Sequence, residues 1–567
     1  MHENAKSPLS ASSRLFLLVL VTVTGGVVLA IEVLGTRVIG TFYGSSLYVW
    51  AALLSVTLVC LAIGYAAGGL LADRAPHGWV LCLLVMLAGA SVLLVRPMTA
   101  VLEPFSTLFG LAWGAIASAG VIFFGPLTLL AMAGPYVIRL RARAVERVGS
   151  TSGAVYALST VGSVLGVLAV VFVMIPRLGT HGSLLVCSGA LIGAGALGLA
   201  VLWRGKAAAA LLLAALPVLA RSDPPTVPGE LFHAESAYGQ MRVIQQDRTE
   251  RGPYRMLMVN GIMQTGMPLD IGLVAAGSIL QTDRYTLELL PYFHPDLGCG
   301  RRGVLIGLAG GMFPRVMEFY DIDWTAVEID VQVAELAKAY FGYRGGIFLP
   351  DGRAHAVDLS RFPHRNLPPV HDHPGGALPE DRPEADPDAA YPGRAVIQDG
   401  RQYLLRHPDP VDFIVLDAYS SDTIPFHLIT REFFELVRSR LTADGILAIN
   451  YIGRPHGDFV TDALFRTLGS VFGPERLLAY RTRADKAEVQ VITIFAFREK
   501  QNMELYPLWR QDDPSGGADR LSYELAQRKL QTSRPGGIVI TDDLNPIDLA
   551  RAQTALQWRR QTMAVLK

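Results

Sequence analysis

The 567-residue sequence lacks several features that mark common classes of protein. Its four cysteines are isolated, so neither a disulfide framework nor the paired spacing of a zinc site is visible. Its formal net charge is zero, and no basic run suggests nucleic acid as a partner. It has no G-K-[ST] phosphate-binding motif, which argues against ATP. We therefore expect no metal and no nucleic-acid partner.

Charged residues are also scarce in the first 220 residues, where long apolar runs take their place. A membrane span needs about 20 mostly apolar residues. Such runs occupy 15–36, 48–72, 79–96, 112–138, 154–176 and 182–203. The shorter stretch 207–220 contains Pro217 and fits either a seventh span or an interfacial helix. The pattern predicts a multi-pass transmembrane domain at 1–220, with the lipid bilayer of the cell (inner) membrane as its partner.

Lys and Arg are unevenly distributed among the loops, and cytoplasmic loops carry the excess in membrane proteins. The amino-terminal tail and the loops after the second, fourth and sixth runs hold nine: Lys6, Arg14, Arg74, Arg139, Arg141, Arg143, Arg147, Arg204 and Lys206. The alternate loops hold three: Arg37, Arg96 and Arg177. This excess places the amino terminus in the cytoplasm, and six spans would then place the soluble part there too. A seventh would place the soluble part outside.

Polar residues within the apolar runs have two interpretations each. Glu32 is a candidate functional carboxylate in the membrane, or an interfacial side chain paired with Arg37. Gly64 and Gly68 have the small-xxx-small spacing that favours close helix packing over a transport pathway. None of these residues indicates a transported substrate.

Beyond residue 220 the composition is that of a soluble protein. Residues 221–300 predict a linker and a small β-hairpin subdomain, with strands at 238–246 and 254–264. Residues 301–500 alternate strand and helix patterns, which predicts an α/β Rossmann-like, methyltransferase-type doubly wound parallel sheet. Residues 501–567 are expected to be a helical extension.

Residues 351–394 interrupt the α/β pattern with a segment rich in Pro, Asp and His. His371 and His373 could bind a metal, but they have no partner at a fixed spacing. A surface insertion is therefore the favoured interpretation.

Four sites follow predicted strands of this sheet. The first is a glycine-rich turn, Gly307 to Gly311, and the second is Glu328, 17 residues after Gly311. Asp399 and Asp417 follow two later strands. Ligands of such sheets bind at the carboxyl ends of the strands. Glycines let backbone approach a ligand closely, and a carboxylate after the second strand suits ribose hydroxyls.

This combination predicts a nucleoside site, with an empty structural sheet as the alternative. The turn is not the pyrophosphate-binding G-x-G-x-x-G form, so NAD is disfavoured. A nucleoside cofactor is available in the cytoplasm, which favours six spans over seven.

Several segments resemble the spermidine synthase (polyamine aminopropyltransferase) family, in particular its membrane-fused branch with amino-terminal transporter-like helices. They are SLYVWAALLSVTLVCLAIGYAAGGLLADR, GAVYALSTVGSVLG, VLIGLAGGMFPR with VEID, DGRQYLL, LDAYSSDTIPFHLITREFF and TDDLNP. The resemblance implies transfer of an aminopropyl group from decarboxylated S-adenosylmethionine to an amine such as putrescine, with release of 5′-methylthioadenosine. It also implies a homodimer as a possible assembly.

The resemblance further implies roles for individual residues. Glu328 would hold the ribose hydroxyls, Asp399 the adenine amino group and Gln264 the nucleoside, while Asp417 would be the catalytic carboxylate. The remaining donor-binding candidates are Gly307, Gly310, Gly311 and Gly400. The candidates beside the acceptor amine are Tyr419, Asp422 and Tyr285.

The sequence departs from the family pattern where the amines would bind. Gly310 stands where soluble synthases carry an Asp, Asn260-Gly261 replaces an Asp-Gly turn, and the loop after Asp417 is stretched to Asp422. Two alternatives therefore stay open. The domain could be an S-adenosylmethionine-dependent methyltransferase, or it could be a non-enzymatic sensor or transporter domain that binds a nucleoside or polyamine.

Overall fold

The structure is a computed structural model. It describes residues 10–43, 47–141, 148–203, 227–236, 238–246, 253–269, 286–296, 298–317, 320–363, 393–420, 423–484, 488–499, 503, 505, 525–533, 536–546, 554 and 557–558. The chain divides into two compact units: Met1–Thr226 with Glu235–Gly239, and Val227–Ala234 with Gln240–Lys567.

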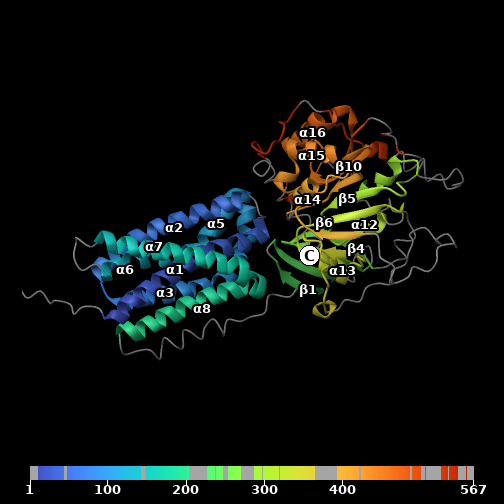
Figure 1. Cartoon of the computed structure of the whole chain (residues 1–567). Coiled ribbons are helices and arrows are strands. Elements are labelled where there is room, and N and C mark those ends of the chain that lie inside the picture. The colour runs from blue at the N-terminus through green and yellow to red at the C-terminus, as the bar shows by residue number, and fades with distance from the viewer. Residues whose placement is uncertain are drawn as a thin grey trace, which may run out of the picture. The chain divides into compact units, whose positions relative to one another are not determined.

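The first unit is a bundle of helices (Figure 1). Its main helices are α1 (Ala11–Tyr43), α2 (Leu47–Arg74), α3 (Gly78–Leu93), α5 (Leu102–Ala131), α7 (Val148–Ala169) and α8 (Ile175–Trp203). Shorter segments connect them: α4 (Val95–Met98), η1 (Thr99–Val101), α6 (Ala133–Arg141) and the π-helical η3 (Val170–Met174).

Four helical stretches of the described chain are long and apolar enough to cross a membrane. They are Ala11–Gly40, Val49–Arg74, Trp113–Arg141 and Val148–Val201, and the bent pair Gly78–Leu93 with Val95–Val101 would make a fifth. The predicted count of six is not confirmed, because α7, η3 and α8 form one stretch of 54 residues. Its backbone leaves helical geometry at Gly179 (φ 68°, ψ 179°).

Glycine allows close contact between two pairs of helices in this bundle. A Cβ at Gly68 of α2 would lie 2.6 Å from the Met132 Cα that follows α5. On the other pair, a Cβ at Gly162 of α7 would lie 2.0 Å from the Thr22 carbonyl oxygen of α1. Interfaces of membrane helices use small residues in this way, since close backbone approach maximises van der Waals contact.

The second unit begins with a four-stranded antiparallel sheet. Its strands, in spatial order, are β1 (Glu230–Glu235), β2 (Gln240–Gln246), β3 (Tyr254–Val259) and β4 (Ile262–Pro268). The stretch predicted as one strand at 254–264 is two strands. Asn260 and Gly261 both have positive φ (49° and 76°), as a tight hairpin turn requires.

The larger sheet has eight strands in the order β11-β12-β10-β9-β5-β6-β8-β7. Their bounds are β5 (Arg302–Ile306), β6 (Asp323–Glu328), β7 (Gly346–Phe348), β8 (Arg394–Ile397), β9 (Val411–Leu416), β10 (Leu441–Gly453), β11 (Leu477–Arg481) and β12 (Gln490–Phe497). The six strands from β10 to β7 are parallel. β12 is antiparallel to both β10 and β11, so the sheet is mixed rather than purely parallel as predicted.

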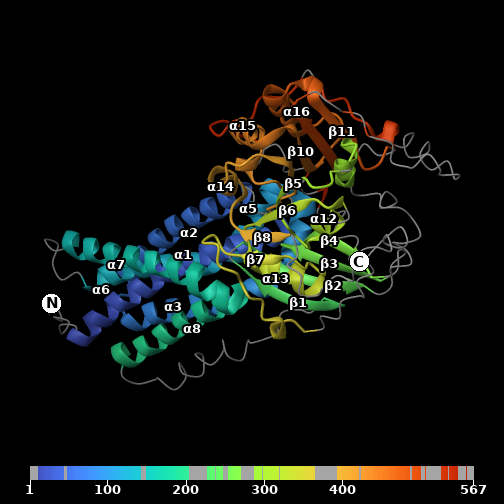
Figure 2. The same ribbon diagram turned by 45° about the vertical axis from the view of Figure 1, so that its right-hand side comes forward.

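Helices cover both faces of this Rossmann-like sheet. One core contains buried side chains of α14 (Gly400–Arg406), α15 (Arg431–Arg440) and α16 (Phe459–Phe472). The opposite core contains those of η4 (Thr286–Phe293), α12 (Met312–Met317) and α13 (Val331–Tyr340). Figure 2 shows α15 and α16 together beside β10 and β11. Short 3-10 segments complete the unit: η6 (Leu359–Arg361), η7 (Phe426–Leu428) and η8 (Pro474–Arg476).

The small sheet packs on α13 of the large domain. Met241 and Leu257 share a buried core with Leu336 and Tyr340. The Arg255 guanidinium donates to the Tyr340 carbonyl at 2.9 Å. This contact brings β4 close to the strand ends described below.

Several predicted segments lie wholly or largely outside the described residues. These are the doubtful seventh span at 207–220, most of the insertion with His371 and His373, and most of the extension at 501–567.

Candidate functional site

The four predicted strand-end sites lie on four adjacent strands. In the sheet order β9-β5-β6-β8, Asp417 follows β9 and the glycine turn follows β5. Glu328 ends β6, and Asp399 comes shortly after β8. Because these strands are parallel, all four sites lie at the same edge of the sheet. Ligands of open α/β sheets bind at this edge.

The glycine turn that follows β5 has a left-handed backbone at three positions. Gly307, Ala309 and Gly311 have φ values of 96°, 47° and 71°. A Cβ at Gly307 would lie 2.4 Å from the carbonyl oxygen of Asp417. Glycine is therefore required at this position both for its conformation and for the close approach of β5 to the end of β9.

Glu328 is buried beside this turn, and its side chain holds two backbone segments. One carboxylate oxygen accepts from the Leu308 amide at 2.9 Å, and the other accepts from the Asp330 amide at 3.1 Å. Burial raises the pKa of Glu328, while these amides act in the opposite direction. A carboxylate has about four lone-pair sites. The Ala309 amide also reaches this carboxylate, so about one acceptor site remains, which suits a ribose hydroxyl.

The small sheet reaches the glycine turn through β4. The Gly310 amide donates to the Thr265 hydroxyl at 2.8 Å. Gln264, the residue before Thr265, lies at a bulge in β4, since the pairing of β4 with β3 shifts between Leu257 and Met258. Bulges re-aim side chains and are frequent beside active sites. Gln264, the predicted nucleoside contact, thus immediately precedes a residue that touches the turn.

Asp417 directly follows β9 and contacts the strands on both sides of it, β5 and β10. Its amide donates to the carbonyl of Ile306 in β5 at 2.9 Å. Its carboxylate accepts from the Asn450 side-chain amide at 2.7 Å. The Tyr419 hydroxyl donates to the Asn450 carbonyl at 2.6 Å. The structure therefore joins Asp417 and Tyr419 through Asn450.

Asp399 caps the amino terminus of α14. One carboxylate oxygen accepts from the Gln402 amide at 2.9 Å, and the other lies 2.8 Å from His427 Nε2. The hydrogen bond from His427 is the main reason that the pKa of Asp399 is lowered. A Cβ at Gly400 would lie 2.3 Å from the Ile306 side chain, so glycine lets α14 start close to β5.

Two predicted site residues, Tyr285 and Asp422, lie outside the described residues. Conversely, the sequence did not point to Thr265, His427 or Asn450. The motif PFHLITREFF contains His427, but only the fold brings it to Asp399. Asn450 lies within the apolar segment GILAINYI, which has a strand pattern, and a polar residue in such a run was an available signal.

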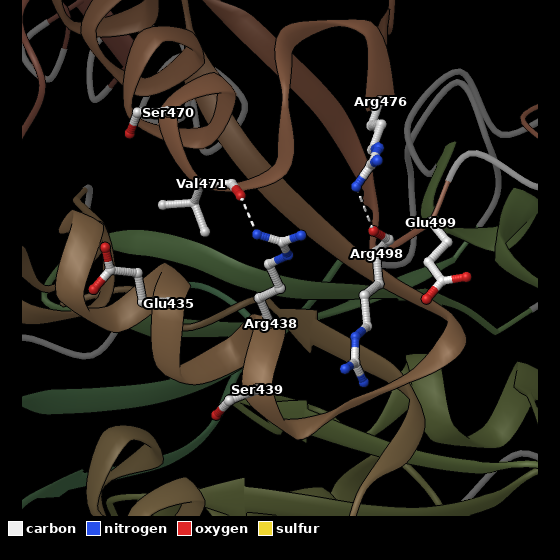
Figure 3. A pocket seen from close by; sticks show the side chains of 8 residues that line it. All are labelled: Glu435, Arg438, Ser439, Ser470, Val471, Arg476, Arg498 and Glu499. Carbon is white, nitrogen blue, oxygen red and sulfur yellow. Dashed lines mark hydrogen bonds between the residues drawn. The ribbon is translucent and has the colours of Figure 1, made fainter.

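A separate cavity of about 910 Å³ lies at the opposite edge of the sheet, where β10 begins. Arg438, Arg476 and Arg498 contribute to its lining. Figure 3 shows Arg438 directed to the carbonyl of Val471 and Arg476 directed to that of Arg498. These arginines bind main-chain carbonyls and are remote from the strand ends. Among the described residues there is no group of three His, Cys, Asp or Glu side chains placed to hold a metal.

Comparisons with known proteins find relatives over part of the chain. A probable polyamine aminopropyl transferase of Bifidobacterium longum is 25% identical over 264 residues, which are 43% of this chain and 48% of the relative. A polyamine aminopropyltransferase of Vibrio vulnificus is 30% identical over 178 residues (30% and 44%). An N-terminal histidine N-methyltransferase of Emericella nidulans is 28% identical over 183 residues (32% and 25%).

The chain spans less than half the length of each of these relatives. Among solved structures, a probable spermidine synthase from Corynebacterium glutamicum aligns with 58% of this chain and 94% of its own. The identity is 14% and the TM-score is 0.34. No protein-family model matches the chain. The chain is thus similar to polyamine aminopropyltransferases over part of its length.

Proposed function

We propose that this protein is a membrane-anchored polyamine aminopropyltransferase. It would transfer an aminopropyl group from decarboxylated S-adenosylmethionine to an amine such as putrescine and release 5′-methylthioadenosine. The observation that carries the proposal is the placement of Glu328, the glycine turn and Asp417 on adjacent strand ends. The relatives named as aminopropyltransferases support it.

In the proposed reaction, the acceptor nitrogen attacks the aminopropyl carbon that is bonded to the sulfonium. A C–N bond forms, the C–S bond breaks, and its electron pair leaves with sulfur as a neutral thioether. The acceptor must be a neutral amine when it attacks, and the product nitrogen must lose a proton. Asp417 is the residue that would orient the acceptor and take up this proton, a contribution of roughly 10²–10⁴ in rate.

Positioning of the two substrates would supply a further part of the rate enhancement. Glu328 would fix the ribose through the acceptor site that the Leu308, Asp330 and Ala309 amides leave open. Asp399 would receive the adenine amino group on the lone pair that the Gln402 and Arg401 amides and His427 leave open. Gln264 would approach the same nucleoside from β4. Tyr419 and Asp422 are the candidates for the acceptor side.

A second candidate function is methyl transfer from S-adenosylmethionine. One relative is named as a histidine methyltransferase. In addition, Gly310 carries no carboxylate at the place where the resemblance implies an Asp beside the donor's amine. A donor that keeps its own carboxylate would meet no repulsion there.

The apolar helices support an anchor in a membrane. We infer a cytoplasmic soluble domain from the uneven distribution of Lys and Arg among the loops. A lipid bilayer and a small polyamine would then be the partners, with a homodimer as a possible assembly. No resident metal is needed, because the sulfonium already activates the carbon that is attacked.

The two reactions are separated by their products. The purified full-length chain is incubated with an amine and either decarboxylated or intact S-adenosylmethionine, and both products are identified by mass. Methylthioadenosine with an aminopropylated amine supports the proposal. S-adenosylhomocysteine with a methylated product supports the second candidate. Saturable donor binding without either product contradicts both and indicates a sensor.

A further inference from the structure

The segment Ile538 to Pro546 contacts α16, the start of α15 and η7. The Ile540 side chain is fully buried. Its amide donates to the Thr467 hydroxyl of α16 at 2.9 Å, and its carbonyl accepts from the Arg431 amide at 2.8 Å. Further along, the Asn545 side chain donates to the Phe426 carbonyl at 3.0 Å. We call this segment the strap.

A chain of polar contacts runs from the strap to Asp399. Two Arg401 nitrogens donate to the two carboxylate oxygens of Asp542, at 2.8 and 2.6 Å. Arg401 also donates to the carbonyl of His427 at 3.2 Å. The His427 ring then contacts the Asp399 carboxylate at 2.8 Å. Asp542 therefore fixes the main chain of the residue whose ring orients Asp399.

The charges of Asp542 and Arg401 favour the observed geometry. The hydrogen bond from Arg401 lowers the pKa of Asp542, and the same contact raises the pKa of Arg401. A bidentate guanidinium–carboxylate pair fixes direction as well as distance. The strap residue itself is positioned by Glu432, whose carboxylate accepts from the Asp542 amide at 3.0 Å.

We infer that the strap is a positioning element of the nucleoside site, acting through Asp542, Arg401 and His427 on the Asp399 carboxylate. This inference rests on the proposed function, since it assigns a use to the orientation of Asp399. The three residues are positioning residues, because they act on the ligand only through Asp399.

The test is the affinity of the full-length protein for 5′-methylthioadenosine, measured by isothermal titration calorimetry. Asp542→Asn removes the charge-assisted pair. Its side chain is 42% exposed, so we expect a modest effect of about three- to tenfold weaker binding. Asp543→Asn is the matched control, since this neighbouring carboxylate is exposed, and its affinity should equal that of the wild type.

A double-mutant cycle identifies the route of the effect. Arg401→Gln should weaken binding to a similar extent, and adding Asp542→Asn to it should change nothing further, because the link is already broken. In turnover, Asp542→Asn should raise KM for the nucleoside donor and leave KM for the amine unchanged. A purely structural strap would instead lower the melting temperature without this selective change.

The outcomes separate this inference from the function on which it rests. If the wild-type protein binds no adenosine-type ligand, the proposed function is wrong. If the wild type binds the ligand and folded Asp542→Asn binds it equally well, the proposed function stands and the role of the strap is refuted.

Discussion

Replacing Glu328 with glutamine tests the ribose-binding role, because the two side chains have the same shape. Each carboxylate oxygen of Glu328 accepts a backbone amide, from Leu308 and from Asp330. Glutamine has one acceptor oxygen, so its NH₂ group must face one of these amides as a second donor. The variant therefore loses one hydrogen bond in the free protein, and its NH₂ group can no longer accept a ribose hydroxyl.

The expected magnitude follows from the value of hydrogen bonds to charged groups, about 1.5–3 kcal/mol each. Replacing the charged acceptor of the ribose hydroxyl by a neutral amide should weaken nucleoside binding by about 2–3 kcal/mol, roughly 30- to 150-fold. The effect on folding should be smaller. The lost backbone bond destabilises the variant, but removing a buried charge offsets part of that loss.

The pH dependence of stability provides a second comparison between the wild type and Glu328→Gln. Burial raises the pKa of Glu328 in the folded state. The folded protein therefore holds this proton more tightly than the unfolded chain, and it loses stability as pH rises from the ordinary Glu range through the raised pKa. The Glu328→Gln variant should lack this loss in thermal unfolding measured across the same pH range.

Glu335→Gln is a matched control, because Glu335 is also a buried carboxylate and lies 2.8 Å from His355 Nε2. It should lower stability without changing affinity for 5′-methylthioadenosine in calorimetry. If the Glu328→Gln variant binds this ligand within threefold of the wild type, Glu328 does not hold the ribose.

Three further predictions concern the glycine turn, the Asp399 contact and the membrane part. Gly307→Ala places a methyl group against the Asp417 carbonyl and should destabilise the protein by about 2 kcal/mol or more in chemical unfolding. Gly352 is the control, because it has a similar φ but no neighbour within 4 Å of an added Cβ. Gly352→Ala should therefore show only the smaller backbone cost. The hydrogen bond from His427 lowers the pKa of Asp399, which gives stability that is present above the ordinary Asp range and lost as pH falls through the folded pKa. His427→Gln removes this effect and should shift acid unfolding to higher pH. An unchanged acid transition would count against this contact. A carboxyl-terminal fusion reporter should be active in the cytoplasm, and activity on the outer side would overturn the six-span topology.

Much of the candidate site could be predicted because it is local in sequence. A glycine turn and an acidic residue directly after apolar strands are visible without a structure. Parallel strands bring their carboxyl ends to one edge, so Gly307, Glu328, Asp399 and Asp417 were expected to lie together. The sheet order confirms their placement on neighbouring strands. Their roles toward a ligand stay predictions.

The remaining features depend on pairings that are distant in the chain. Asn450 contacts Asp417 across 33 residues, and Thr265 contacts Gly310 across 45. An apolar strand pattern also does not show whether the strand runs parallel or antiparallel to its neighbour. The antiparallel pairing of β12 with β10 was therefore missed, although the segment VQVITIFAF at 489–497 has a clear strand pattern. In the helical unit, hydropathy located the apolar segments, and the break in helical geometry at Gly179 lies between the predicted runs 154–176 and 182–203.

The most direct test of the account is the rate of methylthioadenosine release from decarboxylated S-adenosylmethionine and putrescine by the full-length protein. The wild type should release it in proportion to the aminopropylated amine. Asp417→Asn keeps an oxygen that can accept from Asn450, so it should fold normally and lose about 10²-fold or more in kcat. Asp444→Asn, an exposed change at the start of β10, should match the wild type. Equal rates for Asp417→Asn and the wild type, or no methylthioadenosine from a wild type that binds the donor, would contradict the account.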